Sequence, residues 1–306
     1  MMKLFPNGDR VFEVISRYDD LLAMEAREDY EPGDTLALIV PFLVLHNISE
    51  ADITTLATRA TLTGGAAELV ASLKSSGWEV FCITTTYEQY AGHITQKLDI
   101  PLSNVASTPF SLDKFSRILC QEDAALLKQM EQDILAIGDD DKIKQKLDNF
   151  FWGKLPQTDL GRATRKVKPI GGQRKVAALK RFSESFGQPL SNWVAVGDSI
   201  TDFKMLREVD HAGGLAIAFN ANQYALPYAT MSLASTDISD LVPVLDAWQT
   251  SGRGGTEKVV RAKEKAGGKE DRENFHWLAD KKDISNIITL HKRIRRLVRE
   301  EAGKLG

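Results

Sequence analysis

The chain has 306 residues, of which 43% are hydrophobic and 26% are charged, as in ordinary globular proteins. The longest apolar stretch, residues 36–45, is too short to span a membrane, and residues 1–10 contain no hydrophobic signal region, so we expect a cytoplasmic protein without membrane insertion. Two cysteines exclude a disulfide framework, and the spacing of the five histidines disfavours a zinc site.

Charge is distributed unevenly along the chain. Residues 251–306 carry 15 basic and 9 acidic residues, a net of +6, whereas the rest carries 24 basic and 33 acidic residues, a net of −9. Residues 252–255 (GRGG) read as a linker, and Gly267-Gly268 breaks the tail again. We therefore expect an acidic core at residues 1–250 and a separate, basic helical tail at residues 251–306.

Two stretches of the core are predicted to be helical modules inserted into a sheet. The first covers residues from about 14 to 60 and is interrupted at residues 31–34. The second covers residues from about 108 to 160, where Leu126, Met130 and Ile134 follow one another at helical spacing. The segments that build the sheet then lie at about residues 61–105 and 165–250.

Strands and helices alternate in the remaining segments. Short apolar runs predict strands at residues 79–83, 193–196, 215–219 and 229–233. Amphipathic patterns predict helices at residues 65–74, 87–98 and 175–186. This alternation predicts an α/β fold with a Rossmann-like, mostly parallel sheet that is covered by helices on both faces.

The sequence WVAVGDSITDFKM, residues 193–205, contains the strongest candidate for a functional site. Asp198 follows a buried strand and Gly197, at the end of the strand where open α/β sheets bind ligands. Asp202 alone would more often be an acid that favours a helix N-terminus for structural reasons. Together Asp198 and Asp202 have the carboxylate oxygens that Mg²⁺ prefers, which favours phosphoryl transfer.

Two further residues fit the same chemistry. Thr84 is predicted to end its strand, where its hydroxyl would bind a phosphoryl oxygen, although threonine commonly ends strands for structural reasons. Lys175 opens a helix after Gly171-Gly172 and would neutralise developing charge, although a solvated surface lysine has the same appearance. Asn220 and Asn222, after a later strand, are read as turn residues.

In this order, Thr84, Lys175 and the Gly197-Asp198-x-x-x-Asp202 pattern resemble the second, third and fourth motifs of the haloacid dehalogenase-like (HAD) phosphohydrolase superfamily. Residues 16–23 (SRYDDLLA) and 31–43 (EPGDTLALIVPFL) are similar to archaeal members described as subunit R of energy-converting hydrogenase A. The resemblance implies a Mg²⁺-dependent phosphatase of small phosphorylated metabolites. In it Asp198 and Asp202 hold the metal, Thr84 and Lys175 bind the phosphoryl group, and the helical modules act as caps.

The first motif of the superfamily, a strand ending in Asp-x-Asp, has no counterpart in the chain. In relatives its first aspartate is the nucleophile and its second the general acid and base, and its strand lies in the middle of the sheet. Loss of a central strand would leave apolar faces and unpaired backbone groups, which favours a truncated or inactive chain. The alternative function is a non-catalytic subunit or binding protein of a larger, hydrogenase-type complex.

Residues 283–299 predict an amphipathic helix in the tail. Ile284, Ile287, Ile288, His291 and Ile294 lie near one face, together with Arg295 and Val298. The opposite face gathers Lys292, Arg293, Arg296 and Arg299. The helix either packs its apolar face on the core or presents the basic face to an acidic protein partner, whereas nucleic acid is disfavoured because the body is acidic.

Overall fold

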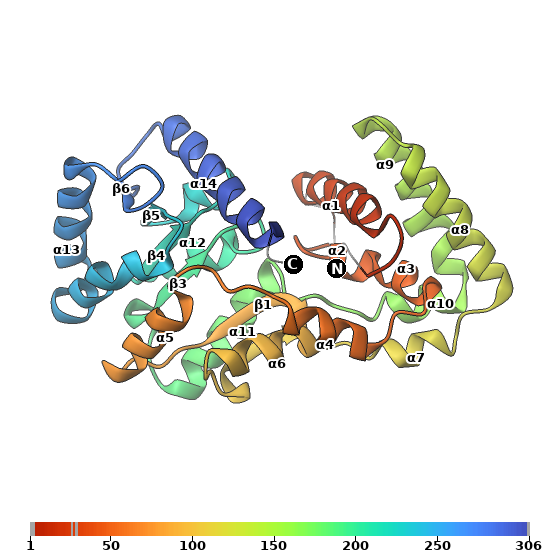
Figure 1. Cartoon of the computed structure of the whole chain (residues 1–306), viewed down its shortest axis with the longest axis horizontal. Helices are drawn as coiled ribbons and strands as arrows, with labels where there is room; N and C mark the ends of the chain where they lie inside the picture. The colour runs from red at the N-terminus through yellow and green to blue at the C-terminus, as the bar shows by residue number, and fades with distance from the viewer. Residues whose placement is uncertain (1–3, 26, 28–29, 305–306) are drawn as a thin grey trace. The chain divides into compact units, whose positions relative to one another are not determined.

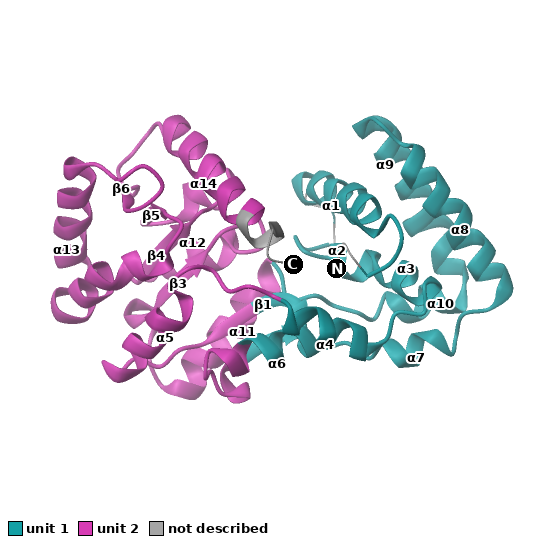
Figure 2. Cartoon of the chain, viewed as in Figure 1, with its two compact units in different colours: residues 1–59, 84–94, 105–171 teal, residues 60–83, 95–104, 172–306 magenta. Residues whose placement is uncertain are grey.

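The chain passes repeatedly between two units, which Figure 2 shows in different colours. The computed structural model describes residues 4–25, 27 and 30–304. Unit 1 comprises residues 1–59, 84–94 and 105–171, and unit 2 comprises residues 60–83, 95–104 and 172–306. No single described helix is long and apolar enough to cross a membrane, although the bent pair formed by residues 35–45 and 50–58 meets those two criteria jointly.

Unit 1 is built mainly from helices (Figure 1). Its α-helices are α1 (Gly8–Met24), α2 (Thr35–Leu38), α3 (Val40–Leu45), α4 (Glu50–Thr58), α7 (Leu112–Ser116), α8 (Gln121–Ala136), α9 (Asp140–Asp148) and α10 (Asp159–Thr164). A π-helix, η2 (Asn149–Lys154), follows α9 directly and leads into the 3₁₀ turn η3 (Leu155–Gln157). A two-stranded sheet joins β1 (Cys82–Tyr87) to β2 (Val105–Thr108), with α6 (Glu88–Lys97) and the turn η1 (Leu102–Asn104) between them in sequence.

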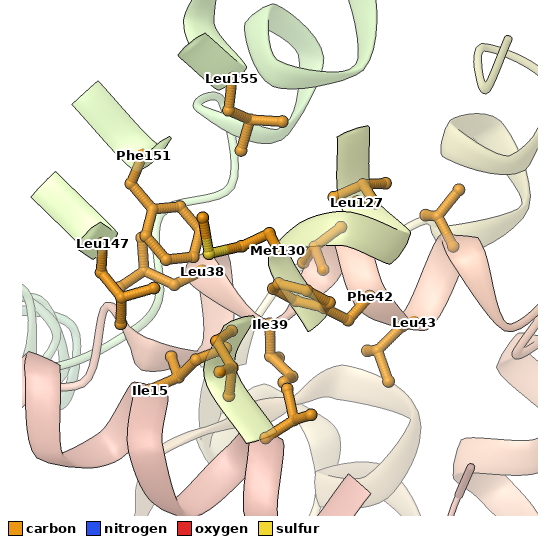
Figure 3. Close-up of a cluster of buried hydrophobic side chains, with 14 of the residues drawn as sticks. Ile15, Leu38, Ile39, Phe42, Leu43, Leu127, Met130, Leu147, Phe151 and Leu155 are labelled. Atoms are coloured by element: carbon orange, nitrogen blue, oxygen red, sulfur yellow. The ribbon is translucent and has the colours of Figure 1, made fainter. Parts of the chain in front are cut away.

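Helical periodicity creates the core of unit 1. Helix α1 buries Val11, Val14, Ile15, Tyr18 and Leu22, which recur every three or four residues and so share one face. Helix α8 buries Leu127, Met130 and Ile134 in the same way. Figure 3 shows Ile15 of α1, Met130 of α8 and Phe151 of η2 in one apolar cluster. The two predicted cap inserts therefore share one hydrophobic core.

Unit 2 contains a four-stranded sheet in the order β3–β4–β5–β6. Strands β3 (Val194–Gly197), β4 (Leu215–Phe219) and β5 (Met231–Ala234) are parallel, and β6 (Asn274–Trp277) pairs antiparallel to β5. The helices of this unit are α5 (Ala66–Ser75), α11 (Gln173–Phe186), α12 (Phe203–His211), α13 (Val242–Ala266) and α14 (Ser285–Lys304), with the turns η4 (Leu190–Asn192), η5 (Leu226–Tyr228) and η6 (Ile238–Leu241).

The alternation of side chains along β4 explains why helices cover both faces of this sheet. Ala216 and Ala218 belong to a cluster with residues of α11, α12 and α14. Leu215, Ile217 and Phe219 belong to a second cluster with residues of α5 and α13. Every residue of β4 is buried, as expected for a strand that lies between two others in the sheet, and it matches the strand predicted at residues 215–219. The prediction of a mixed α/β fold with parallel strands and a helical C-terminal region is confirmed.

Three predictions about local structure are wrong. Strand β1 begins at Cys82 and continues to Tyr87, so Thr84 lies inside the strand; the following threonines and Tyr87 favour an extended chain. The predicted glycine linker is instead a kink at Gly252 (φ 59°, ψ −156°), where two helical stretches join to form α13. The tail also contains β6, whose sequence NFHW alternates polar and apolar residues but is only four residues long. Residues 251–306 are therefore an integral part of unit 2.

Candidate functional site

Four charged side chains of unit 2 meet at the carboxyl ends of β3 and β4, and we call them the β3–β4 site: Lys175, Asp198, Asp202 and Arg295. Backbone contacts hold the loops together. The Asn222 N–H donates to the Asp198 carbonyl oxygen at 2.9 Å, and the Gly172 N–H at the start of α11 donates to the Thr201 carbonyl oxygen at 3.0 Å. The ends of adjacent parallel strands are where ligands bind in open α/β sheets.

Asp202 and Lys175 form a buried ion pair within this site. Both residues are 5% exposed, and Lys175 Nζ donates to Asp202 Oδ1 at 2.7 Å. The other carboxylate oxygen, Oδ2, accepts from the backbone N–H groups of Asp198 (3.1 Å) and Ser199 (3.0 Å) and from the Ser199 hydroxyl (2.9 Å). Burial by itself would raise the pKa of Asp202, but the Lys175 ammonium and these donors hold it below its usual value.

Steric hindrance explains why the Gly-Asp-x-x-x-Asp pattern begins with glycine. A Cβ atom on Gly197 would lie 2.6 Å from the Cβ atom of Asp202, which is too close for two carbon atoms that are not bonded to each other. Gly197 therefore allows Asp202 to fold back under the loop and to bind the Asp198 and Ser199 N–H groups. Asp202 orders the turn in this arrangement, and it makes no side-chain cap to α12.

Asp198 is more accessible than Asp202. Its side chain is 53% exposed, and its Oδ2 atom lies 2.7 Å from Arg295 Nη1. The surrounding chain reduces hydration of the carboxylate and, together with the charge of Asp202, raises the pKa of Asp198 despite the opposing effect of Arg295. Among the described contacts, none involves Oδ1 of Asp198. Asp198 is thus the member of the site that a ligand can reach.

Helix α14 contributes two residues that sequence reasoning did not place in the site. Arg295 Nη1 donates to the carbonyl oxygens of Asp198 (2.6 Å) and Asn220 (3.1 Å), as well as pairing with the Asp198 carboxylate. His291 is fully buried, and its Nδ1 accepts from the Ala221 N–H at 2.9 Å. Burial, with smaller contributions from neighbouring cationic groups, lowers the pKa of His291 to about 3, so it remains neutral. The signal in the sequence was a histidine and an arginine four residues apart within an apolar helix face.

Asn220 and Asn222 have the structural roles that were predicted. Asn220 adopts a left-handed conformation (φ 45°), and its side chain exchanges hydrogen bonds with the backbone of Ser235. The Asn222 side-chain oxygen accepts from the N–H groups of Tyr224 (3.1 Å) and Ala225 (3.2 Å), which closes a turn. Both residues shape the loop after β4.

Thr84 is in the part of β1 that belongs to unit 1, and none of the described hydrogen bonds or ion pairs joins it to the β3–β4 site. Its hydroxyl oxygen accepts from the Thr86 N–H at 3.2 Å. The structure therefore brings Lys175, Asp198 and Asp202 together, whereas a role for Thr84 beside them stays a prediction.

The site fits a magnesium ion only through Asp198. No group of three or more histidine, cysteine, aspartate or glutamate side chains that could hold a metal occurs in the described part of the chain. Both oxygens of Asp202 already accept hydrogen bonds from the protein, which suits a residue that supports the loop rather than a direct ligand. Mg²⁺ is often held by one or two carboxylates and several waters, so Asp198 with water satisfies the chemistry of the ion.

A groove runs along the outer edge of β3, within unit 2. Strand β3 is an edge strand of the sheet. Residues 78–81, which do not pair with β3, line the groove together with it. The groove has a volume of about 690 Å³ and is lined by apolar side chains, among them Trp78, Trp193, Val194 and Val196. Val196 is 39% exposed, although it belongs to a parallel strand. Unpaired edges of this kind are places where a further strand can be added.

Comparisons with known proteins were made at the level of families, curated proteins and solved structures. No protein-family model and no curated protein matches the chain. The chain is similar to the solved structure of gene product AF1437 from Archaeoglobus fulgidus, with 27% sequence identity and a TM-score of 0.84. The match covers 100% of this chain and 92% of that chain. The arrangement of secondary structure is therefore shared with a protein whose name states no activity.

Proposed function

We propose that unit 2 is the core of a HAD-type phosphohydrolase that acts on small phosphomonoesters when a strand bearing a nucleophilic aspartate occupies the β3 groove. The observation that carries the proposal is the position of this groove beside β3, the strand that directly precedes Asp198. The resemblance requires a central strand at that place. No strand among the described residues is followed by Asp-x-Asp, so the nucleophile has to come from a segment outside them.

The residues of the β3–β4 site have distinct parts in this proposal. Asp198 holds Mg²⁺, which supplies charge neutralisation to the phosphoryl group when it is bound. Lys175 places a buried positive charge at the ends of the strands, where the attacking carboxylate would lie. Asp202 keeps the ammonium of Lys175 in position and orders the loop that carries Asp198. The attacking carboxylate would form an acyl phosphate while the alcohol leaves with a proton, and water would then release phosphate.

The experiment is complementation of the 306-residue chain with a synthetic peptide of five apolar residues followed by Asp-x-Asp. With p-nitrophenyl phosphate and Mg²⁺, we expect background hydrolysis by the chain alone and Mg²⁺-dependent turnover after the peptide is added. A peptide with asparagine in place of the first aspartate should give none, and Asp198→Asn should reduce the complemented activity to background.

Two outcomes would refute the proposal. Robust Mg²⁺-dependent turnover by the chain alone would show that the nucleophile lies elsewhere. Failure of the peptide to activate the enzyme, although it binds beside β3 as judged by protection of β3 amides from hydrogen exchange, would remove the phosphohydrolase assignment.

The second candidate function is that of a non-catalytic subunit. It is favoured by the ion pairs themselves, because Lys175 and Arg295 already neutralise both carboxylates of the site. The outward face of α14 also exposes Lys292, Arg293 and Arg296, although Arg293 pairs with Asp271 and Arg296 with Glu300. A salt-sensitive complex with an acidic protein, lost on reversing Lys292 to glutamate, would support this function.

A further inference from the structure

Unit 1 contains a cavity of about 290 Å³ that the β3–β4 site does not involve. We call it the unit 1 cavity. Part of its wall is apolar and is formed by Leu38, Phe151, Leu155 and Val167, each of which is buried. Its volume lies at the small end of the range for ligand sites. The cavity therefore has room for a small molecule with a compact apolar body.

The polar part of the wall carries more positive than negative charge. Arg27, Arg165 and Lys168 line the cavity, against one carboxylate, that of Asp34. Within the described residues, no ion pair or side-chain hydrogen bond involves Arg165 or Lys168. Both side chains are exposed to solvent at the cavity, so an anion that enters it can reach their charged groups from the solvent side.

A hydrogen-bond network connects side chains beside Arg27 at the cavity. The π-helix η2 places Phe151 and Trp152 side by side in sequence at the cavity, and short π-helical segments frequently occur at functional sites. The Trp152 indole N–H donates to the Tyr18 hydroxyl at 2.7 Å, and that hydroxyl donates to Asp148 Oδ1 at 2.5 Å. Asp148 Oδ1 also binds Arg27 Nη1 at 3.0 Å.

The same network orients Arg27 toward the cavity. Its guanidinium carbon lies 4.2 Å from the centre of the Trp152 ring, so the cation rests on the indole face as well as pairing with Asp148. The described side-chain hydrogen bonds of Arg27 use Nη1, which leaves further N–H groups of its planar fork for an anion. An arginine that is preorganised in this way binds carboxylate or phosphate with little loss of side-chain freedom.

We propose that the unit 1 cavity binds a small organic anion, whose carboxylate or phosphate group is held by Arg27, Arg165 and Lys168 and whose apolar body lies against Phe151 and Leu155. The aromatic side chains in the wall suit an unsaturated ring. The binding site is separate from the chemistry proposed for unit 2, and it does not depend on that chemistry.

The test uses the full chain with three probes of similar shape: benzoate, phenyl phosphate and the uncharged benzamide. Binding is followed by calorimetry and by the indole N–H signal of Trp152 in ¹H–¹⁵N spectra, assigned with Trp152→Phe. We expect saturable binding of at least one anion, which shifts this signal, and no saturable binding of benzamide. The anion that binds more tightly identifies the preferred head group.

Matched variants distinguish the cavity from other cationic surfaces. The double variant Arg165→Gln with Lys168→Gln should bind the anion roughly tenfold or more weakly, because two charge-assisted contacts are lost. Arg162→Gln is the control, since Arg162 lies on the same short helix as the cavity wall but pairs with Asp159 at 2.5 Å. It should leave the affinity unchanged.

A third variant tests whether the β3–β4 site of unit 2 contributes to anion binding. Asp198→Asn should not alter the shift of the Trp152 signal, whatever the outcome for phosphatase activity. Equal binding of benzamide, an unchanged affinity in the double variant, or the absence of binding by either anion would overturn the proposal.

Discussion

Each unit buries an aspartate, and the two units stabilise the carboxylate in different ways. In unit 1, Asp19 is 5% exposed and accepts from the Tyr30 hydroxyl at 2.5 Å and the Gly33 N–H at 3.1 Å, which are neutral donors. In unit 2, Asp202 is equally buried but accepts from the Lys175 ammonium. Burial raises the pKa of Asp19 to about 6, whereas Lys175 helps to hold the pKa of Asp202 below its usual value. At Asp19 the neutral donors do not offset the loss of hydration, whereas at Asp202 the charge of Lys175 is the largest of the effects that do.

The largest expected effect concerns the contribution of the tail to unit 2. Deletion of residues 251–306 removes β6 and α14, and with them the buried side chains of Phe275, Trp277 and Ile294. Each such side chain contributes about 1.5–3 kcal/mol, so the loss approaches the whole stability of an average domain. We expect the amides of β4 to lose protection in hydrogen exchange and unit 2 to bind a hydrophobic dye. An unchanged melting temperature, with loss of only a salt-sensitive association, would show that the tail is a docking element.

The second largest effect is expected when the ion pair between Lys175 and Asp202 in unit 2 is broken. Lys175→Met leaves the buried carboxylate of Asp202 without its cation, and we expect a loss of about 3–5 kcal/mol in the free energy of unfolding, measured with urea. Lys180→Met on the same helix is the control, because the Lys180 side chain is 50% exposed and its pair with Glu208 should contribute about 0–1 kcal/mol. If both substitutions have equal effects on the free energy of unfolding, then Asp202 does not depend on the charge of Lys175 and the contrast with Asp19 is wrong.

We expect the titration of Asp19 to make unit 1 less stable as the pH rises. Because its pKa is raised from 3.8 to about 6 in the folded protein, the carboxyl favours folding below pH 4 and loses that contribution as the pH rises to 6. At pH 7 the loss amounts to about 3 kcal/mol. We expect the stability of the natural chain, relative to Asp19→Asn, to fall by this amount between pH 4 and pH 7. A difference that is constant with pH would mean that the pKa of Asp19 is not raised.

The sequence predicted most of the fold of unit 2, because its strands are short apolar runs separated by amphipathic helices. It also placed Asp198, Asp202 and Lys175 in one site, since each adjoins a strand end or a helix start. It could not show that Asp202 faces away from solvent, because that depends on the space left by Gly197. Strand β6 and Arg295 were missed for a related reason. Both act through partners that are distant in sequence, and neither a four-residue alternation nor a position on a helix face shows which strand or loop it will contact.

The hydrogen bonds of Arg295 to the loops after β3 and β4 also have a consequence for the order of assembly. During translation Asp198 and Asn220 are synthesised well before α14. The loops that contain them can therefore reach their final positions only after this helix has been made. Unit 1, in contrast, has all of its residues by position 171. During synthesis, chaperones would therefore meet a chain whose helical unit can already close while the strand ends of the other unit still lack their last arginine.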